Sequence, residues 1–127
     1  MTSSVVQGPF TRPHDRILGM DNPTIFGKII RRELPAKIIY EDEEFIAFHD
    51  IRPRSKVHIL VCPKEYIPTL ADYPNTPEGA TKLGKLMLTT NRIARQLSLE
   101  GYFIGIHVGV QGGQEVFHVH VHLRSDA

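Results

Sequence analysis

The chain has 127 residues, a formal net charge of +1 at pH 7, 41% hydrophobic residues and one cysteine. This length fits a single domain that folds without disulfide bridges, and the near-neutral charge excludes the large basic field that nucleic-acid binding needs. Because no apolar stretch approaches the ~18 residues of a membrane span and the lone Cys62 suits a reducing compartment, we expect a cytoplasmic or nuclear protein that binds neither membranes nor nucleic acid.

The N-terminal segment shows no sustained periodicity and contains several Gly and Pro residues. We therefore expect a flexible arm over residues 1–22 and a folded domain over residues 23–127. At the start of the domain, apolar residues recur at helical spacing between Pro23 and Pro35. This spacing predicts a short amphipathic helix.

Short β-branched and aromatic runs bounded by turn residues predict five strands. These strands are expected at residues 38–40, 45–48, 57–61, 102–110 and 116–123. Between the third and fourth, apolar residues at intervals of three and four predict a long helix over residues 78–99, ending near Gly101. Five antiparallel strands and two helices predict an α+β domain built on a meander sheet.

Three histidines, His118, His120 and His122, alternate with apolar residues in the last predicted strand. Successive side chains of a strand point to opposite faces, so the imidazoles are expected on one face and the apolar side chains on the other. Imidazole changes its charge near neutral pH, so such a row can hold a neutral nucleophile beside a proton donor. The row therefore indicates where the chemistry of the protein lies.

Three interpretations of the row are open. A merely polar strand face is one, although three histidines are an unusual filling for it. A metal site is another, but the outer two Cα atoms lie ~13 Å apart in a strand, so a ligand from elsewhere would be needed. The third is nucleophilic chemistry on phosphorus, which neutral imidazole attacks well. Gly112 and Gly113, just upstream, favour the third interpretation, because glycines let backbone N–H groups approach an anion.

Several segments resemble one family in order and spacing, namely residues 24–30, 35–42, 47–51 and 112–122. Over about residues 23–123 the chain is similar to the histidine triad (HIT) nucleotide-binding proteins, in the branch of purine nucleoside phosphoramidases. The resemblance implies a HIT-like fold, a homodimer and binding of purine nucleotides such as AMP or GMP. It also implies hydrolysis of the phosphorus–nitrogen bond of AMP-amine substrates through a covalent nucleotidyl-histidine, without a cofactor or metal.

The resemblance assigns roles to individual residues. His120 is the expected nucleophile, and His122 is expected to orient it through its backbone carbonyl. His118 and His58 complete the polar cluster around the phosphate, and Asp50 accepts hydrogen bonds from the ribose hydroxyls. Residues expected to enclose the base are Ile25, Phe26, Ile29, Phe48, His49 and Ile51, and those expected near the phosphate are His107, Gly113, Gln114 and Glu115.

Three features depart from the branch. His107 stands where the branch has Asn, and Glu115 stands where it has a Ser that contacts the leaving nitrogen. A carboxylate ~4 Å from a phosphate oxygen costs up to ~4 kcal/mol at an effective dielectric of ~20. We therefore expect Glu115 to favour cationic leaving amines, with a His107 imidazolium as its counter-charge, unless Glu115 is simply a solvated loop residue. Finally, Arg124 replaces an apolar signature residue, and the chain stops at Ala127, short of the family's C-terminal segment.

Three other functions remain as alternatives to the phosphoramidase. A nucleotide-binding or interaction protein would keep the binding residues and lack turnover. A dinucleoside polyphosphate hydrolase of the same superfamily would share the histidine row but not the surroundings of Asp50 and Gly113. A zinc enzyme would lose its activity in a strong chelator.

Overall fold

The computed structural model describes residues 22–126 of the protein. The expected arm lies outside the described residues except for Asn22, which is buried and belongs to the domain. The helices and strands, in chain order, are α2 (Ile25–Ile30), β1 (Ile38–Glu41), β2 (Phe45–His49), β3 (Val57–Pro63), η1 (Leu70–Asp72), α3 (Pro77–Gln96), β4 (Phe103–Gly105), η2 (Val110–Gly112) and β5 (Val121–Ser125).

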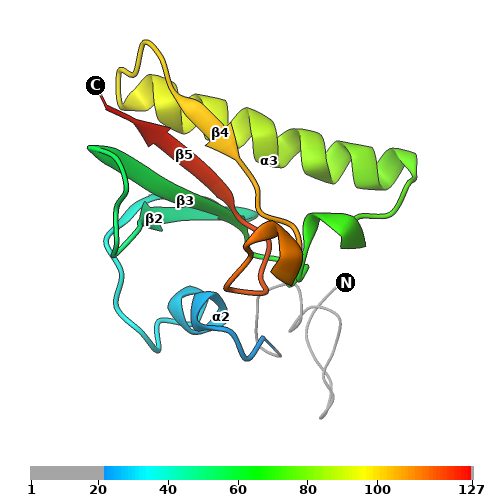
Figure 1. Ribbon diagram of the computed structural model, residues 1–127. Helices are drawn as coiled ribbons and strands as arrows, with labels where there is room; N and C mark the ends of the chain where they lie inside the picture. Colours follow the sequence, from blue (N-terminus) through cyan, green and yellow to red (C-terminus); the bar gives the residue numbers. More distant parts are fainter. Residues whose placement is uncertain (1–21, 127) are drawn as a thin grey trace.

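The five strands form one antiparallel sheet in the order β1-β2-β3-β5-β4 (Figure 1). The predicted α+β class with five antiparallel strands is confirmed, but only β1, β2 and β3 form a meander, because β5 inserts between β3 and β4. Burial explains this order. Val121 and Leu123 of β5 are fully buried, as an interior strand requires, whereas Phe103 of β4 is largely exposed and suits an edge.

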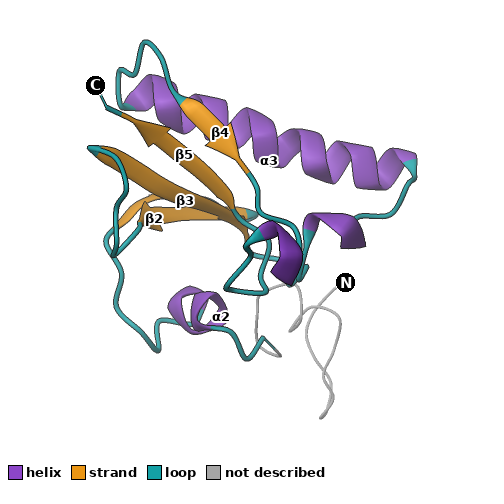
Figure 2. Cartoon of the chain, in the orientation of Figure 1, coloured by secondary structure: helices purple, strands orange, loops and turns teal. Residues whose placement is uncertain are grey.

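The two helices cover opposite faces of the sheet, α3 on one side and α2 on the other (Figure 2). Because strand side chains alternate, each face has its own apolar core. The core on the α3 face consists of Phe45, Ala47, Ile59, Val61, Leu86, Ile93, Ala94, Val121 and Leu123. The core on the α2 face consists of Phe26, Ile29, Ile46, Phe48, Leu60 and Cys62. Burial raises the pKa of the Cys62 thiol, so this cysteine is an inert part of the core.

The strand that carries the histidines is shorter than predicted. β5 begins at Val121, so His118 and His120 precede the regular ladder. Both rings nevertheless pack against Phe26 of α2, on the face opposite Val121. The alternation therefore predicted the shared face correctly, although the hydrogen-bonded strand covers only part of the row.

The segments before this strand also differ from the prediction. β4 ends at Gly105, and Gly109 then turns the chain with a left-handed φ of 74°. The helix α3 begins at Pro77, where the Thr76 side chain caps it by accepting from the Gly79 N–H at 3.1 Å. It ends at Gln96, and Ser98 rather than Gly101 takes the left-handed conformation. Within residues 22–126, no helix is both long and apolar enough to cross a membrane.

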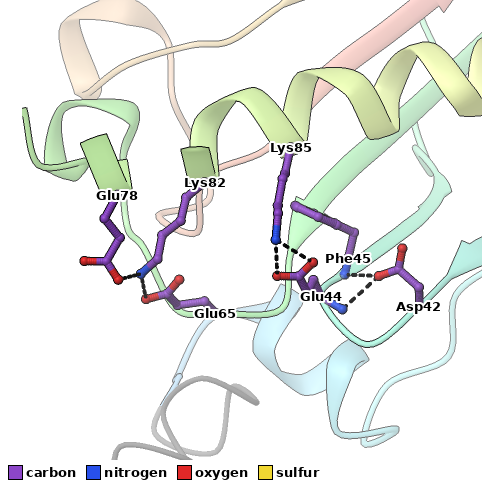
Figure 3. A network of polar contacts seen from close by, with 7 residues as sticks. All are labelled: Asp42, Glu44, Phe45, Glu65, Glu78, Lys82 and Lys85. Atoms are coloured by element: carbon purple, nitrogen blue, oxygen red, sulfur yellow. Dashed lines mark hydrogen bonds and ion pairs between the residues drawn. The ribbon is translucent and has the colours of Figure 1, made fainter. Parts of the chain in front are cut away.

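Exposed ion pairs join the N-terminal half of α3 to the sheet (Figure 3). The Lys85 ammonium lies 3.4 Å from a carboxylate oxygen of Glu44, and that of Lys82 lies 3.2 Å from Glu65. Glu44 itself lies in the β1–β2 turn, in which the Asp42 carboxylate accepts from the Glu44 and Phe45 N–H groups. Exposed pairs of this kind contribute only ~0–1 kcal/mol each, so apolar burial holds α3 in place.

Alanine substitutions in α3 should show that apolar burial stabilises the protein more than the exposed ion pairs do. Leu86→Ala removes a fully buried side chain from the α3 face and should lower the free energy of unfolding by ~2–5 kcal/mol. The neighbouring Lys85→Ala, which removes an exposed ion pair, should cost less than ~1 kcal/mol. Urea denaturation of both variants measures the two values. Equal losses would contradict the assignment of the core.

Candidate functional site

The His120 ring is buried and held through one of its two nitrogens. Its Nδ1 lies 2.7 Å from the backbone oxygen of His118. A carbonyl can only accept, so Nδ1 carries the proton and the lone pair of the neutral ring is on Nε2. Burial lowers the pKa of His120, which favours the neutral form. The orienting carbonyl was expected from His122 and comes instead from His118, because the chain bends before β5 and brings that oxygen under the ring.

His118 is fully buried and is bound at both nitrogens. Its Nε2 donates to the Pro63 carbonyl at 2.7 Å, and its Nδ1 accepts from the side-chain amide of Asn22 at 2.6 Å. Burial lowers its pKa to about 4, so the ring is neutral at pH 7. With no ring nitrogen left over, His118 supports His120 and does not face a phosphate. This corrects the expectation that it belongs to the phosphate cluster.

His58 and His122 form a second hydrogen-bonded pair. The Arg54 N–H donates to Nδ1 of His58 at 3.0 Å, so the proton of neutral His58 is on Nε2. This Nε2 lies 2.9 Å from Nδ1 of His122 and 3.4 Å from the Asp50 carboxylate. Because Nδ1 of His122 accepts, the proton of His122 is on Nε2. The chain of bonds thus leaves His122 as a donor beside the lone pair of His120.

Both rings of this pair are kept neutral. Burial, together with the neighbouring imidazoles of His120, His58 and His107, lowers the pKa of His122 to about 4. Burial also lowers the pKa of His58, against the opposing effect of the Asp50 carboxylate. The His120 and His122 ring centroids are 5.0 Å apart. The site therefore places the neutral His120 ring, whose Nε2 carries a lone pair, beside the neutral His122 ring, whose Nε2 carries a proton.

The residues expected to enclose a base divide into two groups. Phe26, Ile29 and Phe48 are buried in the core on the α2 face, where the Phe26 ring meets Phe48 at 5.3 Å and His120 at 4.9 Å between centroids. The members of the second group are exposed and lie at the first residue of α2, at the last residue of β2 and just after β2, namely Ile25, His49 and Ile51. Asp50 is half-buried, and its Oδ1 accepts from the Arg52 N–H at 2.9 Å.

The glycine loop does not form the expected phosphate cradle. The N–H groups of Gly112 and Gln114 donate to the Gly109 carbonyl, and that of Gly113 donates to the Val110 carbonyl. The buried Gln114 amide also serves the loop, since it accepts from the Gly109 N–H and donates to the carbonyls of Pro68 and Val116. The backbone donors of these three residues are therefore all bonded within the loop.

The glycine loop holds the His107 ring in place. Its Nδ1 lies 2.8 Å from the Gly112 carbonyl, and its ring centroid lies 5.0 Å from that of His122. Gly113 has a left-handed φ of 87°, and a Cβ there would lie 3.3 Å from Nδ1 of His107. His107 itself is exposed. Glu115 is also exposed, and its side chain has no hydrogen bond or ion pair within the described part of the chain.

Two residues of the site were missed by sequence reasoning. Asn22 was assigned to the arm, and Tyr66, whose ring stacks on His118 at 6.1 Å between centroids, belonged to no motif. The Asn22–Pro23 start of the helix was a local signal for a cap. A contact between residues 96 positions apart leaves no such signal in one sequence.

The metal interpretation can be tested on the hydrogen bonds. Asp50, His58 and His122 each offer a ligand atom within 4.8 Å of the others. A metal on Nε2 of His58 would move the proton of that ring to Nδ1, where it would face the Arg54 N–H. Histidine ligands normally donate their second N–H to an acceptor. The three residues as arranged therefore do not fit a metal.

An open antiparallel sheet with a row of neutral imidazoles over one face defines the class of this protein. The HIT domain family matches residues 31–126, and the chain belongs to this family. It is 51% identical to an uncharacterized HIT-like protein of Synechococcus elongatus over 105 residues, which cover 82% of this chain and 90% of the relative. It is 42% identical to the purine nucleoside phosphoramidase of Escherichia coli over 106 residues, 82% of this chain and 87% of the relative.

Solved structures agree with this assignment. A HIT family hydrolase from Clostridium thermocellum superimposes with a TM-score of 0.76 at 39% identity, covering 84% of this chain and 92% of that one. The predicted family and the HIT-like fold are thereby confirmed.

The neutral imidazoles predict how stability depends on pH. Unfolded His118 has a pKa of 6.5 and the folded group about 4, so the folded state binds fewer protons between these values. The free energy of unfolding should therefore fall as the pH drops through this window, by ~3 kcal/mol for fully buried His118. The Lys64 ammonium lowers the pKa of Glu41 below 4.5, so that carboxylate acts only at lower pH.

Urea denaturation at several pH values across this window measures the effect. A His118→Asn variant, which lacks one of the buried imidazoles, should give a flatter profile than the unaltered protein. A profile without slope in the unaltered protein would contradict the neutral assignment.

Proposed function

We propose that the protein hydrolyses the phosphorus–nitrogen bond of purine nucleoside 5′-phosphoramidates through a nucleotidyl intermediate on His120. The observation that carries this proposal is the 2.7 Å bond from Nδ1 of His120 to the His118 carbonyl, which leaves the Nε2 lone pair available for attack. The 42% identity to a protein named purine nucleoside phosphoramidase supports the choice of substrate.

The first step forms a bond from Nε2 of His120 to phosphorus and breaks the bond from phosphorus to the amine. The ring of His120 becomes positively charged, and the His118 carbonyl that accepts from Nδ1 stabilises this charge. The departing nitrogen takes a proton from solvent, while the neutral His122, which lies beside His120, donates its N–H to a phosphate oxygen as a hydrogen bond. Water then attacks phosphorus, the bond to His120 breaks, and a proton of the water is released to solvent.

Nucleotide binding would use the face covered by α2. The apolar cluster of Phe26, Ile29 and Phe48 supports a base, with Ile25, His49 and Ile51 at its exposed rim. Asp50 would accept from the ribose hydroxyls with the lone pairs that Arg52 and His58 leave unused. His107 would lie beside the phosphate, because its exposed ring contacts that of His122.

We also propose that the protein is a homodimer of the cytoplasm. β4 is an edge strand, and large apolar side chains are exposed on it and in the adjoining segments, namely Tyr102, Phe103, Val108 and Val110. Exposed apolar side chains beside an unpaired strand edge favour association of two copies. The single cysteine is buried, which suits a reducing compartment.

Removal of the nucleophile should abolish turnover and spare binding. In His120→Ala, kcat/KM for AMP-lysine should fall at least ~10³-fold while AMP still binds, as measured by steady-state kinetics and calorimetry. The unaltered protein should form a labelled AMP adduct on His120 in a single turnover, trapped without acid. Lys82→Ala, in the surface network beyond the sheet, serves as the control and should keep full activity.

The binding protein and the dinucleoside polyphosphate hydrolase each give a different result in this experiment. Full activity of His120→Ala would refute the mechanism. AMP binding without an adduct or turnover in the unaltered protein would favour a binding protein. Preference for dinucleoside polyphosphates over AMP-amines would favour the other hydrolase of the superfamily.

Glu115 should set the preference for the leaving amine. Because its exposed carboxylate has no partner among the described residues, it can attract a cationic amine, by up to ~1 kcal/mol or about fivefold. The ratio of kcat/KM for AMP-lysine to that for a neutral AMP-amide should therefore fall in Glu115→Ser. Glu100→Ser, at another exposed loop carboxylate, should leave the ratio unchanged. An unaltered ratio in Glu115→Ser would show that Glu115 is a solvated loop residue.

A further inference from the structure

Asn22 is a buried polar residue that belongs to no motif of the chain. It is 1% exposed and lies ahead of residues 31–126, the span that the HIT domain family matches. Its side-chain amide contacts His118, 96 residues further along the chain. A buried amide is retained only where its hydrogen bonds are made, so its partners indicate its role.

The orientation of the Asn22 amide is fixed by Thr24. The backbone N–H of Thr24 donates to Oδ1 of Asn22 at 2.9 Å, and the Thr24 hydroxyl donates to the same oxygen at 2.7 Å. Two donors on one atom identify it as the oxygen, so the NH₂ group is the one that faces His118. Asn22 therefore donates to Nδ1 of His118 at 2.6 Å, and this nitrogen must carry a lone pair.

The contact determines the state of His118. With Nδ1 accepting from Asn22 and Nε2 donating to the Pro63 carbonyl at 2.7 Å, the ring can hold only one proton and only one orientation. The adjacent Val119 N–H donates to the Ile67 carbonyl at 2.7 Å. Side chain and backbone are thus both anchored at His118. The carbonyl between them is the one that holds Nδ1 of His120.

The surroundings of Asn22 are fitted to this position. A Cβ on residue 27 would lie 2.6 Å from the Cβ, Cγ and backbone oxygen of Asn22, so only a glycine in α2 leaves room for it. The backbone oxygen of Asn22 also accepts from Arg31 at 2.8 Å. The middle of α2, at Gly27, and its C-cap, Arg31, therefore both contact Asn22.

We propose that Asn22 is a positioning residue for the nucleophile: its amide selects the Nε2–H form of His118 and thereby holds the carbonyl that orients His120. The proposal rests on the proposed role of His120. Asn22 is linked to His120 by two hydrogen bonds: one to the His118 ring, and one from Nδ1 of His120 to the His118 carbonyl.

Two variants of similar size separate this role from simple packing. In Asn22→Asp, a carboxylate replaces the donor and requires a proton on Nδ1, so His118 should become a doubly protonated cation at pH 7. In Asn22→Leu, Nδ1 loses its partner and His118 stays neutral. The titratable groups that face His118 are His120 and Tyr66, and neither is altered in these variants.

The experiment reads the protons on His118 by nitrogen NMR of the full chain without substrate, and then measures kcat/KM. The unaltered protein should show a bare Nδ1 and a protonated Nε2, and Asn22→Asp should show both nitrogens protonated. In both variants kcat/KM should fall about tenfold, as expected for one lost hydrogen bond. Thr76→Ala removes the cap of α3 on the opposite face and should leave His118 and kcat/KM unchanged.

Several results would overturn the proposal. A proton on Nδ1 of His118 in the unaltered protein would do so without any variant. So would a neutral His118 in Asn22→Asp, or kcat/KM within twofold of the unaltered value in both variants. The NMR result needs no turnover, so a failure of the phosphoramidase assignment would be seen separately, as an unaltered protein with the expected His118 and no activity.

Discussion

The hydrogen bond from His120 to the backbone oxygen of His118 is the constraint on which the site depends. A histidine ring has two nitrogens, and fixing the proton on one of them defines the chemistry of the other. Here the fixing group is a peptide carbonyl, 2.7 Å from Nδ1. A carbonyl cannot be protonated at neutral pH and cannot exchange donor and acceptor roles, so Nε2 keeps its lone pair. The bend before β5, which shortens the regular strand, is what brings this oxygen under the ring.

The second feature of the site is that its inner imidazoles are neutral. Burial lowers the pKa of His58, His118, His120 and His122. Asp50 opposes this shift in part at three of them, namely His58, His120 and His122. A cluster of cations would bind a phosphate more strongly but would leave no lone pair to attack it. The inner rings are neutral, and the exposed imidazole of His107 contacts them through His122. The glycine loop holds His107 through the Gly112 carbonyl.

The sequence predicted those parts that depend on local periodicity. Alternation placed His118, His120 and His122 on one face, and helical spacing identified α2 and α3 within a few residues of their ends. It could not give the order of β4 and β5, because pairing across the sheet depends on which strand has both faces buried. The phosphate cradle expected at Gly112 and Gly113 could not be judged from the sequence for a similar reason. Glycines permit an anion cradle, but whether their N–H groups are free depends on the fold of the loop.

Asn22 shows how far tertiary contacts extend the site beyond its motif. Composition placed this residue in an arm, since Asn followed by Pro reads locally as a turn. In the folded protein it is a core residue, because Gly27 leaves space for it and His118 offers an acceptor for its amide. A histidine motif names the rings but leaves open which nitrogen of each ring carries the proton. In this protein that choice is made by groups outside the motif: the Arg54 N–H for His58, the Pro63 carbonyl and the Asn22 amide for His118.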